Sequence, residues 1–374
     1  MNDMNGASPV EDRRWMDAAL NLGQRFVGLT APNPAVGAIL VKDGVVVGCG
    51  ATAPGGRPHA EQIALDEAGA EARGSTLYVT LEPCSHFGVS PPCADALVDA
   101  GVARVVSAIE DPDPRVGGQG HARLRASGVA VTAGPCVDQA RRDHRGHILR
   151  VTTGRPSVTL KLARTVDGFA SGATHDPRLR ITGQIANLRV QIMRSQHDAI
   201  MIGVGTALVD DPMLTVRLPG VDQRPLRVVL DSRLRLPESS RLSTTAAKYP
   251  TVVLTTRAAS EARVEALAAR RIDVARIDAD AEGRLDLAAA LGWLGARGVT
   301  RVFSEGGPSV GSRLVGEGLA DEVVVITGEK PLGRSGLPFL NEQARAKLLD
   351  LSRYRLLETK AYGPDTMRVW NRID

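Results

Sequence analysis

Apolar and polar residues follow two different periods along this chain, and together they predict a regular succession of strands and helices. Short runs rich in Val, Ile and Leu, such as residues 36–41 and 45–48, are typical of strands. The dipeptide Asp43-Gly44 between these two runs predicts a β-hairpin. Stretches with apolar positions three or four residues apart, such as 184–195, predict helices packed on a sheet.

The first part of the chain is predicted to form one α/β unit. Its expected elements are a helix at 15–25, a hairpin at 36–48, a helix at 59–68, a strand at 76–83, a helix at 91–99, a strand at 103–111, a helix at 122–126, a strand at 129–133 and a helix at 137–145. This order predicts a three-layer arrangement around a largely parallel sheet with one hairpin edge.

A domain boundary is expected in residues 147–157, where Gly154 and Pro156 interrupt the pattern. A chain of 374 residues also exceeds what one hydrophobic core usually supports. We therefore predict domains at 1–150 and 151–374. The second is expected to contain strands at 157–165, 198–206, 225–232, 251–256, 274–278, 301–307, 321–328, 355–362 and 366–372, and helices at 184–195, 261–270 and 285–296.

The amino-acid composition indicates which kinds of molecule this protein binds. The net charge is +4, but aromatic residues make up only 3% of the chain and no Lys-rich tract is present. This balance favours a small anionic substrate over nucleic acid, whose bases stack on aromatic side chains. The polar N-terminus and the lack of a long apolar run predict a cytoplasmic protein with no signal peptide and no membrane partner. Its four cysteines are expected to be free or metal-bound.

The strongest chemical signal is a zinc-deaminase pattern. His59-Ala60-Glu61 is followed by Pro83-Cys84 and then by Cys93, and H-x-E with P-C and a second cysteine is the signature of zinc deaminases. A catalytic zinc takes three protein ligands and leaves one position to water. We predict that His59, Cys84 and Cys93 bind Zn²⁺ and that Glu61 transfers protons.

The alternative is that the two cysteines are packed thiols or belong to a closed structural zinc site. A structural site needs a fourth protein ligand, for which His86 is the candidate. The His-x-Glu pairing has no use in such a site, which favours catalysis, with His86 facing the substrate.

With these residues in view, the chain resembles the bifunctional deaminase–reductase family of riboflavin biosynthesis. The matching motifs in the first domain are Pro32-Asn33-Pro34, His59-Ala60-Glu61 and the run from Thr80 to Cys93, whose Pro91-Pro92-Cys93 ending differs from the shorter Cys-x-x-Cys of other deaminases. The resemblance implies a cytidine-deaminase-like three-layer α/β/α domain. It also implies deamination of 2,5-diamino-6-ribosylamino-4(3H)-pyrimidinone 5′-phosphate, with Asn33, His86 and Asp111 on the substrate.

The second domain resembles the family's reductase, which implies a dihydrofolate-reductase-like α/β fold that uses NADPH to reduce the ribosyl group to ribityl. The supporting motifs include Lys161-Leu162-Ala163, Asp210-Asp211-Pro212, Glu305-Gly306-Gly307-Pro308 and Gly363-Pro364-Asp365. The resemblance places on the cofactor Thr206, Asp210, Ser232, Gly307, Pro308 and Ser309. It places on the substrate Lys161, Arg178, Arg194, Leu214, Arg217 and Glu305. For Glu305 two roles stay open, binding a hydroxyl or donating a proton.

The chain also departs from the family pattern. Asp113 stands where the family usually has Asn, which removes a hydrogen-bond donor. Arg180 stands where a tryptophan is common, and Arg164 where a small residue is common. Either arginine suits the 2′-phosphate of NADPH, or else they indicate weakened cofactor binding or altered specificity.

We therefore predict a bifunctional enzyme with one zinc ion per chain and NADPH as cofactor, assembled as a homo-oligomer, a dimer or tetramer. One alternative is an active deaminase with a non-catalytic or altered C-terminal domain. Another is a deaminase that acts on RNA, which the isoelectric point near 9 suggests but the scarcity of stacking residues opposes.

Overall fold

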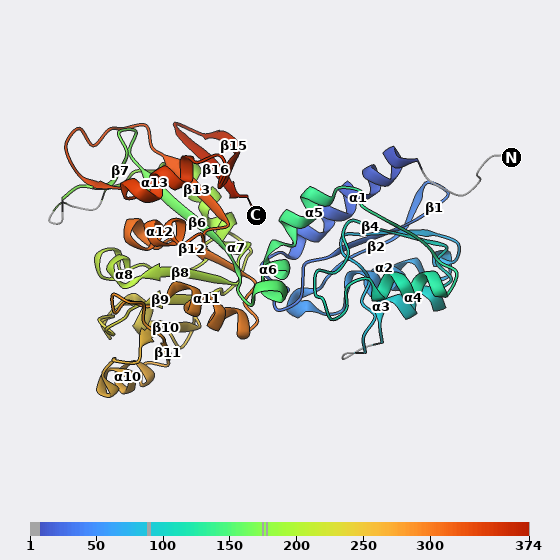
Figure 1. Cartoon of the computed structure of the whole chain (residues 1–374), viewed down its shortest axis with the longest axis horizontal. Helices are drawn as coiled ribbons and strands as arrows, with labels where there is room; N and C mark the ends of the chain where they lie inside the picture. The colour runs from blue at the N-terminus through green and yellow to red at the C-terminus, as the bar shows by residue number, and fades with distance from the viewer. Residues whose placement is uncertain (1–7, 88–90, 174–175, 177–178, 374) are drawn as a thin grey trace. The chain divides into compact units, whose positions relative to one another are not determined.

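The chain divides into two compact units, Met1–Gly154 and Arg155–Asp374, and each is described by itself (Figure 1). The structure is a computed structural model that describes residues 8–87, 91–173, 176 and 179–373. Within these residues, no helix is both long and apolar enough to cross a membrane.

The first unit contains a five-stranded sheet in the order β2-β1-β3-β4-β5. Its strands are β1 (Gly37–Lys42), β2 (Val45–Ala51), β3 (Thr76–Val79), β4 (Arg104–Ser107) and β5 (Ala130–Ala133). The predicted hairpin is confirmed, since β1 and β2 pair antiparallel around Asp43-Gly44. The prediction of a largely parallel sheet with one hairpin edge is also confirmed. Strand β1 pairs antiparallel with both β2 and β3, so β2 has the same direction as the parallel strands β3, β4 and β5, and β1 is the one reversed strand of this sheet.

Helices cover both faces of this sheet. They are α1 (Pro9–Gly23), α2 (Ala60–Ala68), α3 (Cys93–Asp99), α4 (Gln119–Ala126), α5 (Val137–Asp143) and α6 (Arg145–Thr153), with short 3-10 turns at Gln24–Phe26, Pro54–Gly56 and Gly69–Ala72. In Figure 1, α2, α3 and α4 lie on the opposite side of the sheet from α1 and α5. Apolar side chains from α1 to α5 and from the sheet form one core.

The largest differences from the predicted helices of the first unit are at α1 and α6. Helix α1 begins six residues early because Ser8 and Glu11 form a capping box, a polar start signal that apolar periodicity does not register. Residues 145–153, expected in part to form a linker, are helix α6 instead. That helix ends at Gly154, whose φ of 75° is in the left-handed region that favours glycine.

Helix α2 lies directly on the backbone of strand β2. A Cβ atom at Gly48 would lie 2.2 Å from the carbonyl oxygen of Ala64, and one at Gly50 would lie 2.2 Å from that of Ala60. The two glycines point toward the helix because they are two residues apart on the strand. Their lack of side chains allows this close approach, which fixes the position of the helix that starts after His59.

The second unit contains a nine-stranded sheet in the order β11-β10-β9-β8-β12-β6-β13-β16-β15. Its strands are β6 (Ser157–Arg164), β8 (Ala199–Gly203), β9 (Leu226–Leu230), β10 (Thr251–Thr256), β11 (Asp273–Ile277), β12 (Arg301–Ser304), β13 (Glu322–Thr327), β15 (Tyr354–Tyr362) and β16 (Asp365–Arg372). The first seven in the order are parallel, and the hairpin of β15 and β16 adds to them antiparallel. Two short strands, β7 (Phe169–Ser171) and β14 (Leu337–Pro338), pair separately.

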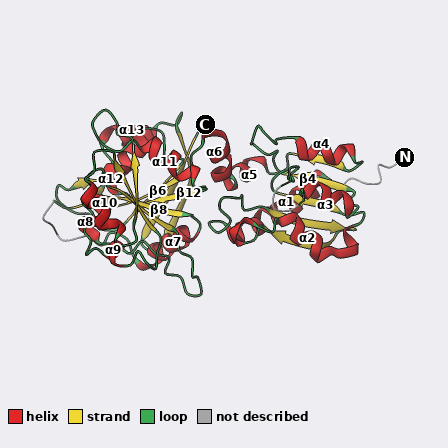
Figure 2. Cartoon of the chain, turned by 90° about the horizontal axis from the view of Figure 1, so that it is seen from below, coloured by secondary structure: helices red, strands yellow, loops and turns green. Residues whose placement is uncertain are grey.

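Helices lie on both faces of this sheet, as Figure 2 shows with α11 and α13 on one side of the strands and α7 and α9 on the other. They are α7 (Gln184–Ser195), α8 (Val204–Asp210), α9 (Arg241–Thr244), α10 (Glu261–Ala268), α11 (Leu287–Ala296), α12 (Gly307–Gly316) and α13 (Glu342–Leu349). Helices α11, α12 and α13 contribute to one apolar core, and α7 to α10 contribute to the two clusters of the opposite face. Helices α8, α9, α12 and α13 were not predicted, and the strands expected at 198–206 and 301–307 end earlier, where α8 and α12 follow them.

Candidate functional site

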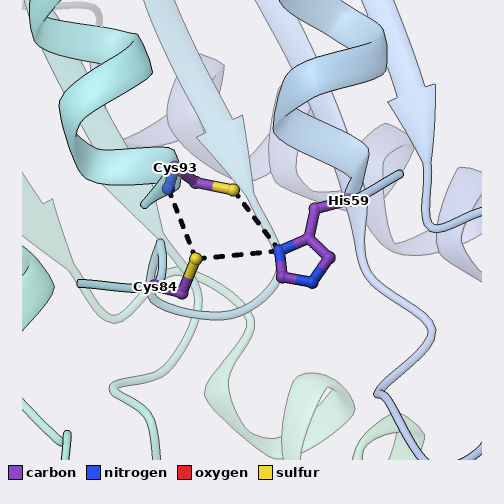
Figure 3. Close-up of side chains that lie close together, drawn as sticks. All are labelled: His59, Cys84 and Cys93. Atoms are coloured by element: carbon purple, nitrogen blue, oxygen red, sulfur yellow. Dashed lines mark hydrogen bonds between the residues drawn. The ribbon is translucent and has the colours of Figure 1, made fainter. Parts of the chain in front are cut away.

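Three metal-ligand side chains of the first unit meet beside the ends of three elements (Figure 3). His59 is the N-cap of α2, Cys93 is the first residue of α3, and Cys84 lies in the loop after β3. The Nδ1 atom of His59 is 3.7 Å from Cys84 Sγ and 3.4 Å from Cys93 Sγ. The backbone N–H of Cys93 donates to Cys84 Sγ at 3.3 Å.

These separations fit a tetrahedral zinc ion. Zinc lies about 2.3 Å from thiolate sulfur and about 2.0 Å from imidazole nitrogen, so tetrahedral geometry separates the sulfur and nitrogen atoms by about 3.5 Å. Among the described residues, no fourth ligand-type atom joins this group, and the side chain of His86 is exposed. The arrangement is therefore that of a catalytic site with three protein ligands rather than a closed structural site.

The surroundings of Cys84 favour the thiolate that a metal requires. Hydrogen bonds from the Cys93 thiol, the His59 ring and the Cys93 backbone, together with the charge of His59, lower the pKa of Cys84 to about 4, against the opposing effect of burial. Cys84 is therefore the thiolate of the pair. The hydrogen bond to Cys84, together with burial, raises the pKa of Cys93, so binding of a cation would have to release the proton of the Cys93 thiol.

Glu61 lies two residues from His59 in the first turn of α2, with only 4% of its surface exposed. Burial, together with the nearby Cys84 sulfur, raises the pKa of Glu61 to about 7. A carboxyl group with a pKa near neutrality can both accept and return a proton. This is the property that a deaminase needs next to its metal.

Two of the three predicted deaminase-substrate residues are held by hydrogen bonds within the unit. The side-chain amide of Asn33 donates to the carbonyl oxygen of Gly56 at 2.8 Å. The Oδ1 atom of Asp111 accepts the N–H of Asp113 at 2.9 Å. His86, the third, is exposed beyond Cys84.

Asp113, which stands where the family usually has Asn, pairs with Arg115. Arg115 donates to both carboxylate oxygens of Asp113, at 2.9 Å from Nε to Oδ1 and at 3.1 Å from Nε to Oδ2. These hydrogen bonds lower the pKa of Asp113 to about 2. The extra negative charge in this loop is therefore balanced by a guanidinium within the same loop.

In the second unit, Arg194 and Glu305 form a buried ion pair. Arg194 Nε lies 2.6 Å from one carboxylate oxygen of Glu305 and Nη2 lies 3.1 Å from the other, while Nη1 donates to the carbonyl oxygen of Thr215 at 2.9 Å. Burial opposes ionisation of Glu305, but the Arg194 charge and its hydrogen bonds outweigh burial and lower the pKa of Glu305.

Other predicted reductase residues surround this pair. Lys161 in β6 and Arg217 both interact electrostatically with Glu305, and the N–H of Arg217 donates to Gln191 Oε1 at 2.9 Å. Leu214 is buried with a φ of 49° one residue before Thr215. The structure thus brings together five of the six, and Arg178 lies outside the described residues.

The predicted cofactor residues follow several strands of the parallel sheet. Helix α12 begins at Gly307 directly after β12, and Pro308 and Ser309 lie in its first turn. Gly307 has a φ of 70°, and a Cβ atom there would lie 3.1 Å from Thr206 Oγ1. Because the exposed N–H groups of a helix N-terminus bind phosphate, this arrangement fits the pyrophosphate of a dinucleotide. Thr206 and Asp210 belong to α8, and Ser232 follows β9.

Arg164 and Ser232 lie at different places across the sheet, Arg164 at the end of β6 and Ser232 after β9. Strands β9 and β6 are separated by β8 and β12, which amounts to about 14 Å at the usual strand spacing. Arg164 Nε donates to Thr327 Oγ1 at 3.0 Å, and its guanidinium lies over the ring of Phe339. Arg180 is exposed shortly before α7.

Sequence reasoning missed two residues that the structure places beside these sites. His147 of α6 has Nε2 3.5 Å from Asp111 Oδ1, and nothing in the sequence connects positions 36 residues apart. Arg227 in β9 is fully buried and donates to the carbonyl oxygens of Met213 and Leu242. A charged residue within an apolar strand was the available signal for Arg227.

Comparisons with known proteins agree with this geometry. Residues 9–109 match the cytidine and deoxycytidylate deaminase zinc-binding region, and residues 156–367 match the RibD C-terminal domain. The chain is 38% identical to riboflavin biosynthesis protein RibD of Aquifex aeolicus over 86% of this chain and 88% of that protein, and 36% identical to RibD of Escherichia coli over 95% and 98%. A solved structure of RibD from Acinetobacter baumannii has a TM-score of 0.86 at 33% identity, covering 98% of this chain and 100% of the other.

The fold and the site define a zinc-dependent deaminase joined to an NADPH-dependent reductase. More narrowly, the chain belongs to the RibD family, the bifunctional enzymes of riboflavin biosynthesis. The match extends over both units, so the alternative of a deaminase with a non-catalytic C-terminal domain is not favoured.

The ligand set leads to a direct prediction. Cys84→Ser should lower the zinc content of the purified chain well below one ion, because an alcohol is a much weaker zinc ligand than a thiolate. Cys49→Ser is the matched control, since Cys49 lies in the same unit outside the ligand group. Elemental analysis measures both, and full zinc occupancy in Cys84→Ser would remove Cys84 from the ligand set.

Proposed function

We propose that the first unit deaminates 2,5-diamino-6-ribosylamino-4(3H)-pyrimidinone 5′-phosphate at the ring 2-position. The second unit then reduces the ribosyl group of the product, giving 5-amino-6-ribitylamino-uracil 5′-phosphate. A related solved structure from Thermotoga maritima, 30% identical with a TM-score of 0.82, is described as a diaminohydroxyphosphoribosylaminopyrimidine deaminase and 5-amino-6-(5-phosphoribosylamino)uracil reductase. The observation that carries the proposal is the buried Glu61 beside the three ligands, in one chain with the buried Arg194–Glu305 pair.

In the deaminase unit, each residue has a separate task. His59, Cys84 and Cys93 would hold zinc, and the ion would supply a Lewis acid that makes water easier to deprotonate. Glu61 would carry one proton from the attacking water to the ring nitrogen, and a second proton from the hydroxyl newly bonded to the ring carbon to the amine, which then leaves as ammonia. Asn33, His86 and the loop at Asp111 hold the pyrimidine, and the amide of Asn33 is already oriented by its bond to Gly56.

In the reductase unit, we assign the substrate to Lys161, Arg178, Arg194, Leu214, Arg217 and Glu305. The cationic groups suit the substrate's phosphate. Of the two roles open for Glu305, its pairing with Arg194 favours binding a hydroxyl, because a carboxylate with a lowered pKa holds no proton to donate.

When bound, NADPH would supply the hydride for C1 of the ring-opened imine, whose nitrogen takes a proton from water, and the task of this chain is to hold the cofactor. We assign this to Thr206, Asp210, Ser232, Gly307, Pro308 and Ser309. Arg164 and Arg180 remain the candidates for its 2′-phosphate. If Arg164 binds the cofactor, it does so at a different part from Ser232, given the strands between them.

One experiment tests both activities. The diaminopyrimidinone phosphate is supplied to the purified chain with and without NADPH, and ammonia release and NADPH absorbance are followed separately. We expect ammonia in both cases and NADPH oxidation after it. Ammonia without NADPH oxidation would contradict the reductase assignment, and no ammonia would contradict the deaminase substrate.

We further propose deaminase and reductase domains at residues 1–150 and 151–374, a cytoplasmic location and a homo-oligomer. All four cysteines are free, which is usual in a reducing compartment. Strand β15 is the edge of its sheet and is exposed along most of its length, including Leu356 and Leu357. Such an edge favours pairing with a second chain. Light scattering of the purified protein should give the mass of a dimer or tetramer, and the mass of a monomer would contradict the proposal.

A further inference from the structure

Glu82 is a buried carboxylate two residues before the metal ligand Cys84, and none of the proposed roles uses it. Only 5% of its surface is exposed. Its oxygens accept three backbone N–H groups: Oε2 from Asp111 and from Gly118, each at 2.9 Å, and Oε1 from His121 at 3.0 Å. Hydrogen bonds from several N–H groups to one carboxylate are among the stronger interactions of this kind.

All three donors belong to one segment of the deaminase unit. Asp111 and Gly118 are the two ends of a loop, residues 111–118, which carries Asp111 itself and the Asp113–Arg115 pair. Because one oxygen of Glu82 accepts from both ends, it closes this loop at its base. His121 lies in the first turn of α4, whose N-cap Gly118 has no side chain to accept a helix N–H, so Glu82 supplies that acceptor.

The same segment is pressed against the turn that holds Cys84. A Cβ atom at Gly120 would lie 2.0 Å from the carbonyl oxygen of Pro83. Arg123 of α4 adds a second tie, donating to the carbonyl oxygen of Ser85 at 3.3 Å and to Asp95 at 2.7 Å. The loop and the metal ligands therefore have little freedom to move relative to each other.

A metal site does not explain this cluster. Glu82, Glu110 and His121 offer ligand-type atoms within 4.8 Å of one another. However, the oxygens of Glu82 already accept three N–H groups, and Nε2 of His121 is 2.7 Å from Ser107 Oγ. Glu110 points largely to solvent, with 62% of its side chain exposed.

We propose that Glu82 is a positioning residue of the deaminase, which holds the loop 111–118 in register with the metal ligands and so sets the affinity for the phosphorylated pyrimidine. This inference rests on the proposed deaminase substrate. Glu82 acts through Asp111 and its neighbours and does not touch the reacting atoms. A displacement of about 1 Å in a residue that positions the substrate can lower kcat/KM by as much as 10²-fold, and here the loss is expected in KM because Glu82 does not touch the reacting atoms.

The test uses the full-length, zinc-loaded chain with Glu82→Gln, which keeps the volume but replaces one accepting oxygen by a donating NH₂ group. We expect the KM for the diaminopyrimidinone phosphate to rise about tenfold or more, with kcat changed less than threefold and zinc content unchanged. Glu110→Gln, a neighbouring exposed carboxylate, should leave all three values as in the wild type. Reductase kinetics with the deaminated substrate should not change in either variant.

Hydrogen–deuterium exchange of the segment 110–121 gives a second measurement that needs no turnover. The segment should exchange slowly in the wild type and in Glu110→Gln, and about tenfold faster in Glu82→Gln. If Glu82→Gln fails to fold, rapid exchange of this segment in the wild type alone would overturn the proposal.

A wild-type KM in Glu82→Gln, or loss of zinc in that variant, would also overturn it. If the wild-type chain itself releases no ammonia, the proposed substrate is at fault. The exchange measurement would then still decide whether Glu82 holds the loop.

Discussion

Replacing Glu61 with glutamine should lower kcat for deamination by about 10²–10⁴-fold while zinc stays bound. That range is the usual contribution of a positioned proton-transfer group. Glu61 is 4% exposed and has a pKa near 7, so the site loses its proton carrier when an amide replaces the acid. His59, Cys84 and Cys93 are unchanged, and the metal therefore keeps all three protein ligands.

Asp66→Asn is the matched control for this variant. Asp66 lies on the same helix α2, is exposed, and contacts Gln62 rather than the ligand group. Ammonia release and elemental analysis should show normal turnover and one zinc per chain in the control. Turnover of Glu61→Gln within threefold of the wild type would remove Glu61 from the mechanism.

Arg194→Met should abolish NADPH oxidation and destabilise the second unit by about 3–5 kcal/mol, the usual cost of leaving one partner of a buried ion pair uncompensated. Arg194 is 8% exposed, and its removal leaves both oxygens of Glu305 without their hydrogen-bonded guanidinium. Denaturant unfolding and NADPH absorbance measure the two effects. Ammonia release by the same chain serves as an internal control.

The double variant Arg194→Met with Glu305→Leu separates stability from function. Removing both charges should restore much of the lost stability, since an apolar pair can replace a buried ion pair. NADPH oxidation should stay absent, because the enzyme has lost both of the charged side chains that are proposed to bind the substrate. Recovery of activity together with stability would show that the pair serves only the fold.

The meeting of His59, Cys84 and Cys93 could be predicted from the sequence because these residues lie in two short motifs whose spacing is the signal. The same holds for the hairpin around Asp43-Gly44, where a turn dipeptide and two apolar runs agree. Helix α7 was also predicted with its observed limits, since its apolar stripe extends over twelve residues. Local patterns of this kind need no knowledge of the tertiary structure.

Features that depend on distant partners were not visible in the sequence. The pairing of Arg194 with Glu305 joins positions 111 residues apart, and as a lone arginine on a helix Arg194 would normally lie in solvent. The antiparallel pairing of β1 with β3 depends on which strand lies beside the hairpin, and periodicity carries no information about that choice.

The close packing of α2 on the two glycines of β2 has a consequence for how precisely the metal-ligand residues are positioned. Most helices rest on interlocking side chains, which can repack when a neighbour changes. Here peptide groups at Gly48 and Gly50 meet the peptide groups of the helix. The positions of His59 and Glu61 therefore depend on contacts between main-chain atoms, whose dimensions vary little. We expect side-chain substitutions elsewhere in the core to shift these two residues very little.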